Sequence, residues 1–336
     1  MESPLWTDEF APEISDLPQP DARDYFETAV AEPLNLVVHG PPGVGKTAAV
    51  RALAAAAHED PDNDLVELNV ADFFDRTKKE IKNDERFASF LRGNSRMSKR
   101  DMINHVLKES ASYQPVSGRY KTVLLDNAEA IREDFQQALR RVMERYAENT
   151  QFVIATRQPS KLIPPIRSRC FSVSMRAPGH DAMVETVERV VSLAGVEYDD
   201  DGLEYLAGYG DGNVREAVLG AQTTAEAEGE VTMTAAYETL GDIGHDDVVE
   251  TMLEAAEQSN FEDARSELDT LIYDEGYDGD EILSDVLGVA RSRYDGRRLA
   301  KLYRIAGEVD FDLTESTSDR VQLGHLLAEI GRPADE

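Results

Sequence analysis

The sequence predicts an α/β nucleotide-binding domain built on a parallel sheet, followed by a helical lid and an all-α C-terminal domain. A glycine-rich octet, GPPGVGKT at residues 40–47, lies between an apolar run and an alanine-rich segment. Between residues 33 and about 175, apolar strand-like runs alternate with helical stretches, as in a parallel sheet. From about residue 178 onward, apolar residues recur at helical spacing. With 336 residues, the chain is long enough for two or three such domains.

The octet has the spacing Gly-x-x-x-x-Gly-Lys-Thr of a phosphate-binding loop. The run Leu34–Val38 before it predicts a buried strand, and Ala48–Ala57 after it predicts a helix. Glycines let the backbone wrap phosphate oxygens, while backbone N–H groups and the helix N-terminus supply positive potential. The alternative interpretation is a glycine-rich turn. At average composition, the eight-residue pattern arises by chance in roughly one chain of this length per hundred. The predicted nucleotide-binding residues are Gly40, Pro41, Pro42, Gly43, Val44, Gly45, Lys46 and Thr47.

Two residues of the loop have separate expected roles. The ammonium of Lys46 can reach the β- and γ-phosphates of ATP, and the hydroxyl of Thr47 can bind Mg²⁺. A second Mg²⁺ ligand is expected at the end of a buried strand, and Asp126 ends the apolar run 123–125. An Asp at the end of a strand is common, but its position after the phosphate loop favours Mg²⁺ coordination. The expected cofactors are therefore ATP and Mg²⁺.

The residue after Asp126 departs from the usual pattern. Most ATPases of this architecture carry there a Glu that polarises the attacking water, whereas this chain carries Asn127. An amide can orient a water molecule but cannot take its proton, and general base catalysis contributes about 10²–10⁴-fold. Glu129, two residues on, would point away from that water in a strand or lie half a turn round in a helix, so we do not expect it to substitute for the missing Glu. We therefore predict that the chain binds ATP and hydrolyses it slowly, if at all.

Composition limits the compartment and the partners. The single cysteine, Cys170, excludes an internal disulfide and fits a reducing cytosol. No apolar run approaches the roughly 18 residues of a membrane span, and the acidic start MESPLWTDEF lacks the features of a signal peptide. We expect a soluble, cytoplasmic protein with no membrane partner.

The net charge of −31 has two interpretations. Such a charge normally argues against a polyanionic partner, because phosphates are repelled. It is also typical of adaptation to a salt-rich cytosol, where the Debye length falls to about 3 Å at molar concentration. Lysine is scarce relative to arginine, and small apolar residues dominate, which favours the halophilic interpretation. Local basic clusters are then more informative about partners than the overall charge.

The predicted domains are residues 1–175, 176–243 and 244–336. The first should contain strands at Leu34–Val38, Leu65–Asn69, Thr122–Leu125, Gln151–Ala155 and Cys170–Val173. After about residue 178 no further strands are expected, and three helices are predicted at Ala182–Leu193, Asp201–Tyr209 and Asn213–Glu228. The third domain shows only helical spacing.

Five short segments carry a family resemblance, in the same order along the chain. They are Leu5–Pro12, Leu65–Asp72, Gln137–Glu144, Ile163–Cys170, which ends in Ser-Arg-Cys, and Gly212–Arg215. Together they resemble the small subunits of replication factor C, a clamp loader of the AAA+ superfamily. The segment Leu5–Pro12 lacks the Lys and Arg of the family's N-terminal box. The resemblance implies an AAA+ domain, a lid that closes over ATP and a C-terminal collar.

The resemblance also assigns roles to three arginines. Arg169, of the Ser-Arg-Cys segment, would meet the γ-phosphate of a neighbouring subunit, and such an arginine finger contributes about 10³–10⁵-fold. Its alternative is a surface ion pair. Arg215, at the second-sensor position, would contact this chain's own γ-phosphate. Arg157 replaces the usual first-sensor Asn and would either bind the γ-phosphate or pair with a neighbouring carboxylate.

The implied partners are a large and a second small clamp-loader subunit, the sliding clamp, and primer–template DNA. Candidate DNA contacts are the basic stretches Arg76, Lys78, Lys79, Lys82 and Arg96, Lys99, Arg100, which are equally explained as local neutralisation of acidic groups. Arg140, Arg141 and Arg145 are expected at a subunit interface. Two alternatives stay open: a free-standing homo-oligomeric AAA+ ATPase acting on DNA, such as a helicase loader or branch-migration motor, and a scaffold in which nucleotide only holds the domains together. Asn127 counts against the first.

Overall fold

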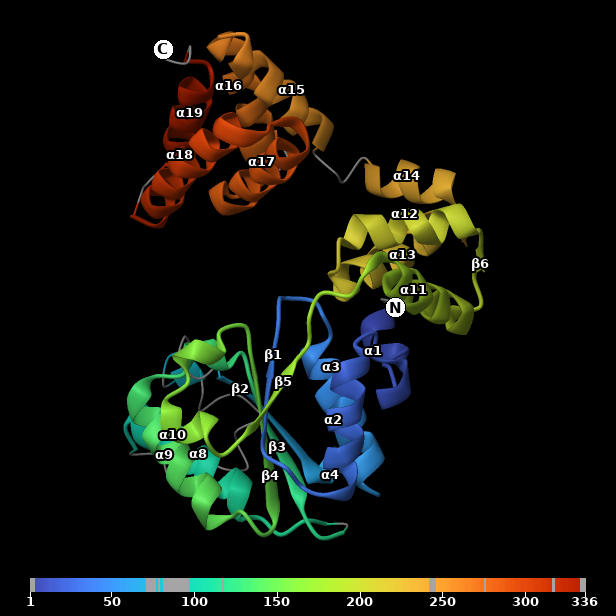
Figure 1. Cartoon of the computed structure of the whole chain (residues 1–336), viewed down its shortest axis with the longest axis vertical. Coiled ribbons are helices and arrows are strands. Elements are labelled where there is room, and N and C mark those ends of the chain that lie inside the picture. Colours follow the sequence, from blue (N-terminus) through green and yellow to red (C-terminus); the bar gives the residue numbers. More distant parts are fainter. Residues whose placement is uncertain are drawn as a thin grey trace. The chain divides into compact units, whose positions relative to one another are not determined.

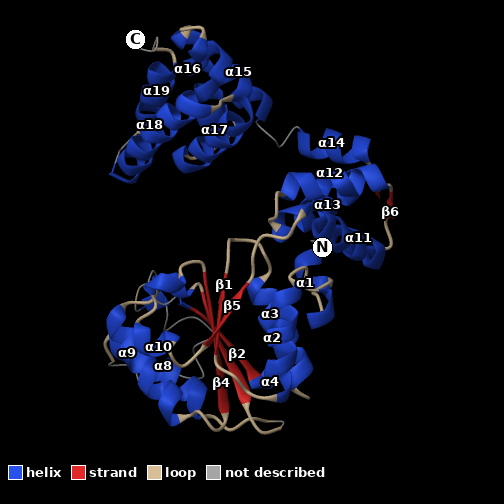
Figure 2. Cartoon of the chain, viewed as in Figure 1, coloured by secondary structure: helices blue, strands red, loops and turns tan. Residues whose placement is uncertain are grey.

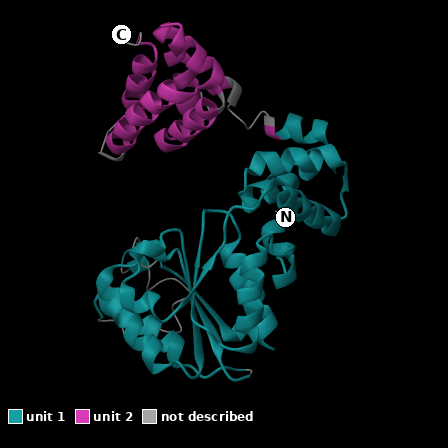
Figure 3. Ribbon diagram, viewed as in Figure 1, with its two compact units in different colours: residues 1–239 teal, residues 240–336 magenta. Residues whose placement is uncertain are grey.

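The computed structural model describes residues 4–70, 77, 79–80, 97–116, 118–241, 246–274, 276–315 and 318–332. It divides into two compact units, residues 1–239 and residues 240–336 (Figure 3). Within the described residues, all strands belong to the first unit, and the second is helical (Figure 2). None of the described helices is long and apolar enough to cross a membrane.

The first unit contains a sheet of five parallel strands in the order β2-β3-β4-β1-β5. Each strand begins and ends within two residues of its predicted position, so the predicted α/β class is confirmed. The parallel arrangement brings the carboxyl ends of all five strands to one edge of the sheet. The strands are β1 (Leu36–His39), β2 (Leu65–Asn69), β3 (Lys121–Asp126), β4 (Thr150–Thr156) and β5 (Phe171–Ser174).

Helices cover both faces of this sheet, as Figure 1 shows. On one face, α2 (Pro20–Ala31) and α3 (Lys46–Ala57) pack with Val153 of β4 in one buried cluster. On the other face, the next residue, Ile154, packs with the second cluster, to which α8 and α9 contribute. Because successive side chains of a strand point to opposite faces, a fully buried strand such as β4 contributes to both layers. The helices of the second face are α8 (Lys99–Ser112), α9 (Glu133–Arg145) and α10 (Pro164–Arg167).

Short elements occupy the connections of the first unit. They lie before the sheet, between α3 and β2, and after the carboxyl ends of β3 and β4. They are α1 (Trp6–Glu9), η1 (Ile14–Asp16), α4 (Pro61–Asp64), η2 (Ala128–Ala130) and η3 (Pro159–Lys161).

The helical part of the first unit follows β5. The three predicted helices are present as α11 (His180–Ala194), α12 (Asp200–Gly210) and α13 (Val214–Glu228). The expectation of no further strands was wrong, because a two-stranded parallel sheet joins β6 (Glu197–Tyr198) to β7 (Glu230–Val231). Strands of two residues are too short to give an alternating pattern. The region also contains a fourth helix, α14 (Met233–Gly241), that was not predicted.

The second unit is a bundle of helices around one core of aliphatic side chains, among them Leu268, Val286 and Leu302. A π-helical turn, η4 (Thr270–Asp274), follows α16. The predicted domain boundaries after residues 175 and 243 stay predictions, since the α/β part and the lid share one unit. The helices are α15 (Asp246–Glu257), α16 (Phe261–Asp269), α17 (Gly279–Arg293), α18 (Gly296–Glu315) and α19 (Asp319–Ile330).

Candidate nucleotide-binding site

The predicted phosphate loop joins the carboxyl end of β1 to the first residue of α3. Gly43 and Gly45 have left-handed backbones, with φ of 70° and 94°. A Cβ at Gly40 would lie 1.8 Å from the carbonyl oxygen of Met175, and one at Gly43 would lie 1.6 Å from Oδ1 of Asn213. Two glycines are therefore required by close approach, and one of those contacts comes from the start of the lid helix α13.

Lys46 is half-buried at the N-terminus of α3. Its Nζ donates hydrogen bonds to the carbonyl oxygens of Gly40 (2.9 Å) and Pro41 (2.6 Å), within the loop itself. Burial lowers the pKa of Lys46; the neighbouring Asp126 and Glu129 carboxylates oppose this shift, and Arg157 adds to it. The ammonium is thus held in the loop, next to groups of both charges from the ends of other strands.

Thr47 and Asp126, the two predicted Mg²⁺ ligands, lie next to each other. The hydroxyl of Thr47 donates a hydrogen bond of 2.8 Å to Oδ2 of Asp126, which joins α3 to the end of β3. A hydroxyl and a carboxylate are the hard oxygen ligands that Mg²⁺ prefers, and Mg²⁺ bound with a nucleotide uses few protein ligands. These two residues therefore fit the metal that accompanies a nucleoside triphosphate.

Asn127 lies at the position expected to activate water. Its backbone is left-handed (φ 52°, ψ 44°), a conformation that Asn tolerates better than most residues. Its backbone N–H donates to Oδ1 of Asp126 (2.9 Å), and its Nδ2 donates to Oδ1 of Asn69 at the end of β2 (3.3 Å). The exposed side chain is thus an amide paired with another amide, and neither group is a general base.

Glu129 lies in η2, just after β3, and its side chain is 11% exposed. Its Oε1 accepts a hydrogen bond from Nε of Arg157 (2.6 Å), and its Oε2 accepts from the Thr156 hydroxyl (3.0 Å) and from N–H of Arg157 (3.2 Å). Burial raises the pKa of Glu129, but these hydrogen bonds outweigh it and hold the pKa below its usual value. Of the two alternatives for Arg157, the pairing with a carboxylate is observed.

The lid and the N-terminal segment complete the site. The backbone N–H of Arg215 donates to the carbonyl oxygen of Gly43 (3.1 Å), and this contact ties α13 to the phosphate loop. The N–H of the nearly buried Trp6 donates to Oε1 of Gln222 on α13 (2.8 Å), and Arg189 of α11 donates to the carbonyl oxygen of Phe10 (3.0 Å). Gln222 and Arg189 were missed from the sequence, because neither belongs to a motif.

One hollow of about 690 Å³, a size typical of small-molecule sites, is lined by many of these residues, among them Lys46, Thr47, Asp126, Asn127, Arg157, Arg189 and Arg215. Its lining includes three acidic side chains, Asp8, Asp16 and Asp126. It also includes five cationic side chains, and the positive excess suits a polyphosphate. The cationic side chains are those of Lys46, Arg51, Arg157, Arg189 and Arg215.

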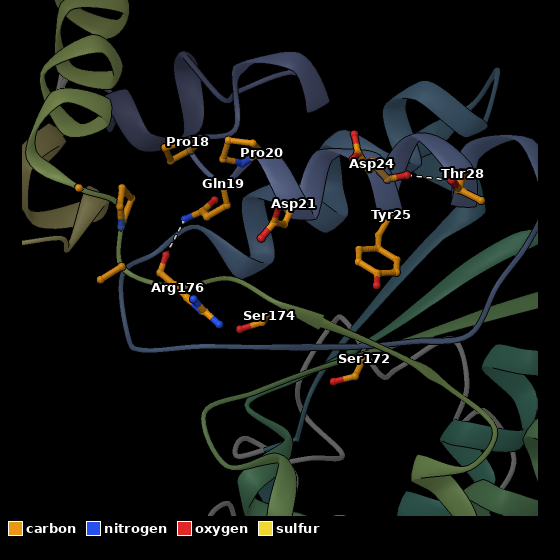
Figure 4. A pocket seen from close by; sticks show the side chains of 13 residues that line it. Pro18, Gln19, Pro20, Asp21, Asp24, Tyr25, Thr28, Ser172, Ser174 and Arg176 are labelled. Atoms are coloured by element: carbon orange, nitrogen blue, oxygen red, sulfur yellow. Dashed lines mark hydrogen bonds between the residues drawn. The ribbon is translucent and has the colours of Figure 1, made fainter.

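A second hollow of about 710 Å³ lies beside α2 and β5 (Figure 4). Its charged lining residues are Asp21, Asp24 and Arg176, so it has no positive excess. The amide of Gln19 lies at its wall and donates to the carbonyl oxygens of Val44 (3.2 Å) and Arg176 (3.1 Å). No residue of the phosphate loop is among its described lining residues, so this hollow is separate from the candidate phosphate site.

Arg169 follows α10 and is not among the residues that line the hollow at the phosphate loop. Its Nη2 lies 2.6 Å from Oε1 of Glu144, which also accepts from Nε of Arg140 (3.0 Å). The ion pair considered as the alternative role of Arg169 is therefore observed. A position outside the chain's own pocket is also what a residue serving a neighbour requires. Burial raises the pKa of the adjacent Cys170 thiol to about 12, which disfavours the reactive thiolate form.

The structure describes only part of the predicted DNA-contact stretches. Arg76, Lys78, Lys82 and Arg96 lie outside the described residues, whereas Lys79 is exposed and Lys99 begins α8. Arg100 is exposed and pairs with Asp134 at 3.1 Å, as expected for local neutralisation. Of the arginines expected at an interface, Arg145 lies over the ring of Tyr146, 5.5 Å from its centroid.

Comparisons with known proteins agree with this architecture. Residues 36–177 match the family described as ATPase family associated with various cellular activities (AAA), and residues 244–329 match the replication factor C C-terminal domain. A replication factor C small subunit from Methanosarcina acetivorans is 30% identical over 88% of this chain and 84% of its own length. This chain belongs to the replication factor C small-subunit family.

Other relatives of this replication factor C family cover a similar share of the chain. The small subunit from Natronomonas pharaonis is 30% identical over 89% of this chain and 85% of its own. That from Halobacterium salinarum is 28% identical over 98% and 97%. Among solved structures, the Thermotoga maritima RuvB Holliday junction branch migration motor has a TM-score of 0.50 and 17% identity over 75% of this chain and 79% of its own. At that identity the likeness shows the fold alone.

Proposed function

We propose that this chain is the ATP-binding small subunit of a clamp loader, which acts with other subunits to place a ring-shaped sliding clamp on primer–template DNA. The observation that carries the proposal is the hollow that brings together Lys46, Thr47, Asp126 and Arg215 in a member of the replication factor C small-subunit family. Cations and N–H donors at one end of a parallel sheet are suited to bind a triphosphate.

The phosphate loop, Asp126 and Arg215 have separate parts in that binding. The phosphate loop surrounds the phosphates, and Lys46 exchanges its two loop carbonyls for β- and γ-phosphate oxygens. Thr47 and Asp126 hold Mg²⁺, which neutralises phosphate charge when it is bound. Arg215, joined to the loop through its own N–H, carries the presence of nucleotide to the lid.

Hydrolysis at this subunit's own site is weak or absent in our proposal. Asn127 has no basic group, and the carboxylate of Glu129 already accepts three hydrogen bonds, so neither takes a proton from water. Arg169 lies outside the hollow and serves instead as the arginine finger of a neighbouring subunit. To reach that subunit, it exchanges Glu144 for the neighbour's γ-phosphate.

The test begins with the native complex. The chain is purified at high salt from the cells that make it, its stoichiometric partners are identified by mass spectrometry, and clamp loading is measured on primed circular DNA. We expect a larger AAA+ subunit and a second small subunit as partners. A homo-oligomer that hydrolyses ATP by itself would contradict the proposal and favour a free-standing motor.

Two variants in that complex separate the roles. We expect Arg169→Ala to leave ATP binding by this subunit unchanged and to slow hydrolysis at the neighbouring site by about 10³–10⁵-fold. Lys46→Ala should weaken ATP binding at this subunit and impair loading. Arg332→Ala, which removes an exposed ion pair with Glu329 in the C-terminal unit, is the matched control. Normal loading by a Lys46→Ala complex would indicate a scaffold.

We also propose that the charge of −31 is an adaptation to high salt. Repulsion among surface carboxylates weakens as the Debye length falls from about 10 Å at 0.1 M to about 3 Å at 1 M. We therefore expect the unfolding temperature to rise as KCl increases from about 0.1 to about 2 M. A flat or falling unfolding temperature in calorimetry would exclude this interpretation.

A further inference from the structure

Arg157, which is paired with Glu129, lies at the wall of the nucleotide hollow. Arg157 lines the hollow, and its side chain is 55% exposed. Its Nε donates to Glu129, while neither terminal nitrogen donates a hydrogen bond to any described residue. A guanidinium is a rigid plane with donors along both edges. The Nε edge of the Arg157 guanidinium is therefore held by Glu129, and the two terminal nitrogens are available to a ligand in the hollow.

Glu129, which binds Arg157, is itself held in place by hydrogen bonds. Glu129 accepts from three donors at the end of β4, and one of them belongs to Thr156, which is 1% exposed. The same carboxylate binds both the backbone N–H and the Nε of Arg157, so it restrains the whole side chain of that residue. A carboxylate that is 11% exposed would be costly without such donors. An arginine held this way loses little further freedom when it binds an anion.

The pair lies near the part of the hollow expected to hold the terminal phosphate. Arg157 and Lys46 line the same hollow, and the charges of Glu129 and Arg157 act on the pKa of Lys46 in opposite directions. In a phosphate loop that ammonium reaches the β- and γ-phosphates. A second fixed cation beside it is therefore placed to meet the γ-phosphate, the group that distinguishes ATP from ADP.

We propose that Glu129 is a positioning residue that holds the guanidinium of Arg157 for the terminal phosphate, so that this site distinguishes ATP from ADP by binding alone. This inference rests on the proposed function, in which the hollow binds ATP. A hydrogen bond between charged groups contributes about tenfold to a hundredfold in affinity. A subunit that does not hydrolyse its nucleotide can in this way still report which nucleotide it holds.

In an alternative arrangement, Glu129 would compete with the phosphate for Arg157. If Glu129 competed with phosphate for the guanidinium, its removal would release Arg157 and strengthen ATP binding. The geometry favours positioning, because Glu129 binds the Nε edge and leaves the terminal nitrogens unbonded among the described residues. The two arrangements therefore predict opposite effects of Glu129→Gln.

The experiment measures the affinities of the full chain for Mg²⁺ with a non-hydrolysable ATP analogue and for Mg²⁺ with ADP, by calorimetry. We expect Arg157→Ala to weaken analogue binding by about tenfold or more and ADP binding by less than about twofold. Glu129→Gln should change the preference in the same direction, by about threefold to tenfold, and should have no further effect in an Arg157→Ala background. Arg332→Ala is the control, and circular dichroism verifies that each variant is folded.

The possible failures are distinguishable. Equal losses for the two nucleotides in Arg157→Ala, tighter analogue binding in Glu129→Gln, or additive effects of the two substitutions would each overturn this inference while nucleotide binding stands. If the unaltered chain, alone and in its native complex, bound neither nucleotide, the proposed function would fail as well.

Discussion

Two lysines lie near opposite ends of the same sheet, and burial lowers the pKa of both. Lys46 follows the carboxyl end of β1, and its ammonium donates to two loop carbonyls in a hollow. Lys121 begins β3 at the amino end, is 2% exposed, and has an Nζ with no hydrogen-bond acceptor among the described residues. Burial lowers its pKa to about 8, partly opposed by the Asp64 carboxylate. A ligand could reach Lys46, which lines the hollow, but not Lys121, which is buried.

The polar side chains near the amino ends of β3 and β4 are buried. His58 and the Thr122 hydroxyl are hydrogen-bonded at 2.8 Å, and that hydroxyl donates to Oε1 of Gln151 (3.1 Å), all inside the unit. The ring of Tyr113 lies 5.6 Å from the Lys121 ammonium. Polar groups at the carboxyl end instead line a hollow, so their charges are available for chemistry. A buried charge with no access to a ligand affects stability and its dependence on pH.

The largest expected effect concerns the carboxyl end and its missing base. Asn127→Glu supplies a carboxylate where the water-activating Glu is expected, and general base catalysis contributes about 10²–10⁴-fold. We expect turnover at this site of the assembled complex to rise by about 10²-fold, at the low end of that range. The left-handed backbone of residue 127 is unfavourable for Glu, and the nearby Arg157 can pair with the new carboxylate. Single-turnover hydrolysis measures the change.

A double substitution separates the effects of the two unusual residues in this site, Asn127 and Arg157. If Asn127→Glu leaves the rate unchanged but Asn127→Glu with Arg157→Asn raises it, Arg157 also disables the site. Asn127→Gln is the matched control, because it lengthens the side chain without adding a base. If none of these variants hydrolysed ATP faster, the site at the carboxyl end of the sheet would lack further catalytic groups besides a general base. The contrast with the amino end would then be weaker.

A smaller effect is expected where the lid meets the phosphate loop. Gly43→Ala places a Cβ against Oδ1 of Asn213 and forces a left-handed alanine, whereas Gly45→Ala meets nothing within 4 Å and has only the backbone strain. The clash should add to a strain of about 1–2 kcal/mol. We expect both variants to lose stability in urea unfolding, Gly43→Ala more than Gly45→Ala. Asn213→Ala should then rescue Gly43→Ala alone; equal losses without rescue would mean that the contact is unimportant.

That contact shows what the sequence could predict and what it could not. The glycines, Lys46, Thr47 and Asp126 could be predicted as a group because each belongs to a local pattern whose physical purpose is known, and Gly43, Gly45, Lys46, Thr47 and Asp126 line one hollow. The approach of Asn213 to Gly43 joins residues 170 positions apart, and no local pattern encodes it. The strands of the main sheet were likewise predicted from their apolar runs.

The Glu129–Arg157 pair was missed for a related reason. The sequence suggested that Glu129 points away from the water and left the partner of Arg157 open. The pair forms because η2 after β3 and the end of β4 lie next to each other at the carboxyl edge of the sheet. Two neighbouring strand ends, one carrying an acid and one a base, were the available signal. Lys121 gave no such signal, since a lysine at the start of a strand is ordinarily exposed.

The smallest expected effect tests the amino end through pH. A lysine whose pKa is about 8 in the folded chain and 10.5 otherwise is penalised when charged. Because the unfolded chain then binds more protons between these values, the Lys121 contribution to stability rises with pH and is lost as pH falls through about 8. Relative to Lys121→Met, the unaltered chain should gain about 2 kcal/mol in free energy of unfolding between pH about 7.5 and about 9.5. Urea unfolding at constant high salt measures this difference, and Lys161→Met, at an exposed position, should show none. If the difference in free energy of unfolding between the unaltered chain and Lys121→Met stayed constant across this range, the Lys121 ammonium would have a hydrogen-bond or charge partner in the folded chain. The lysines at the two ends of the sheet would then be alike in this respect.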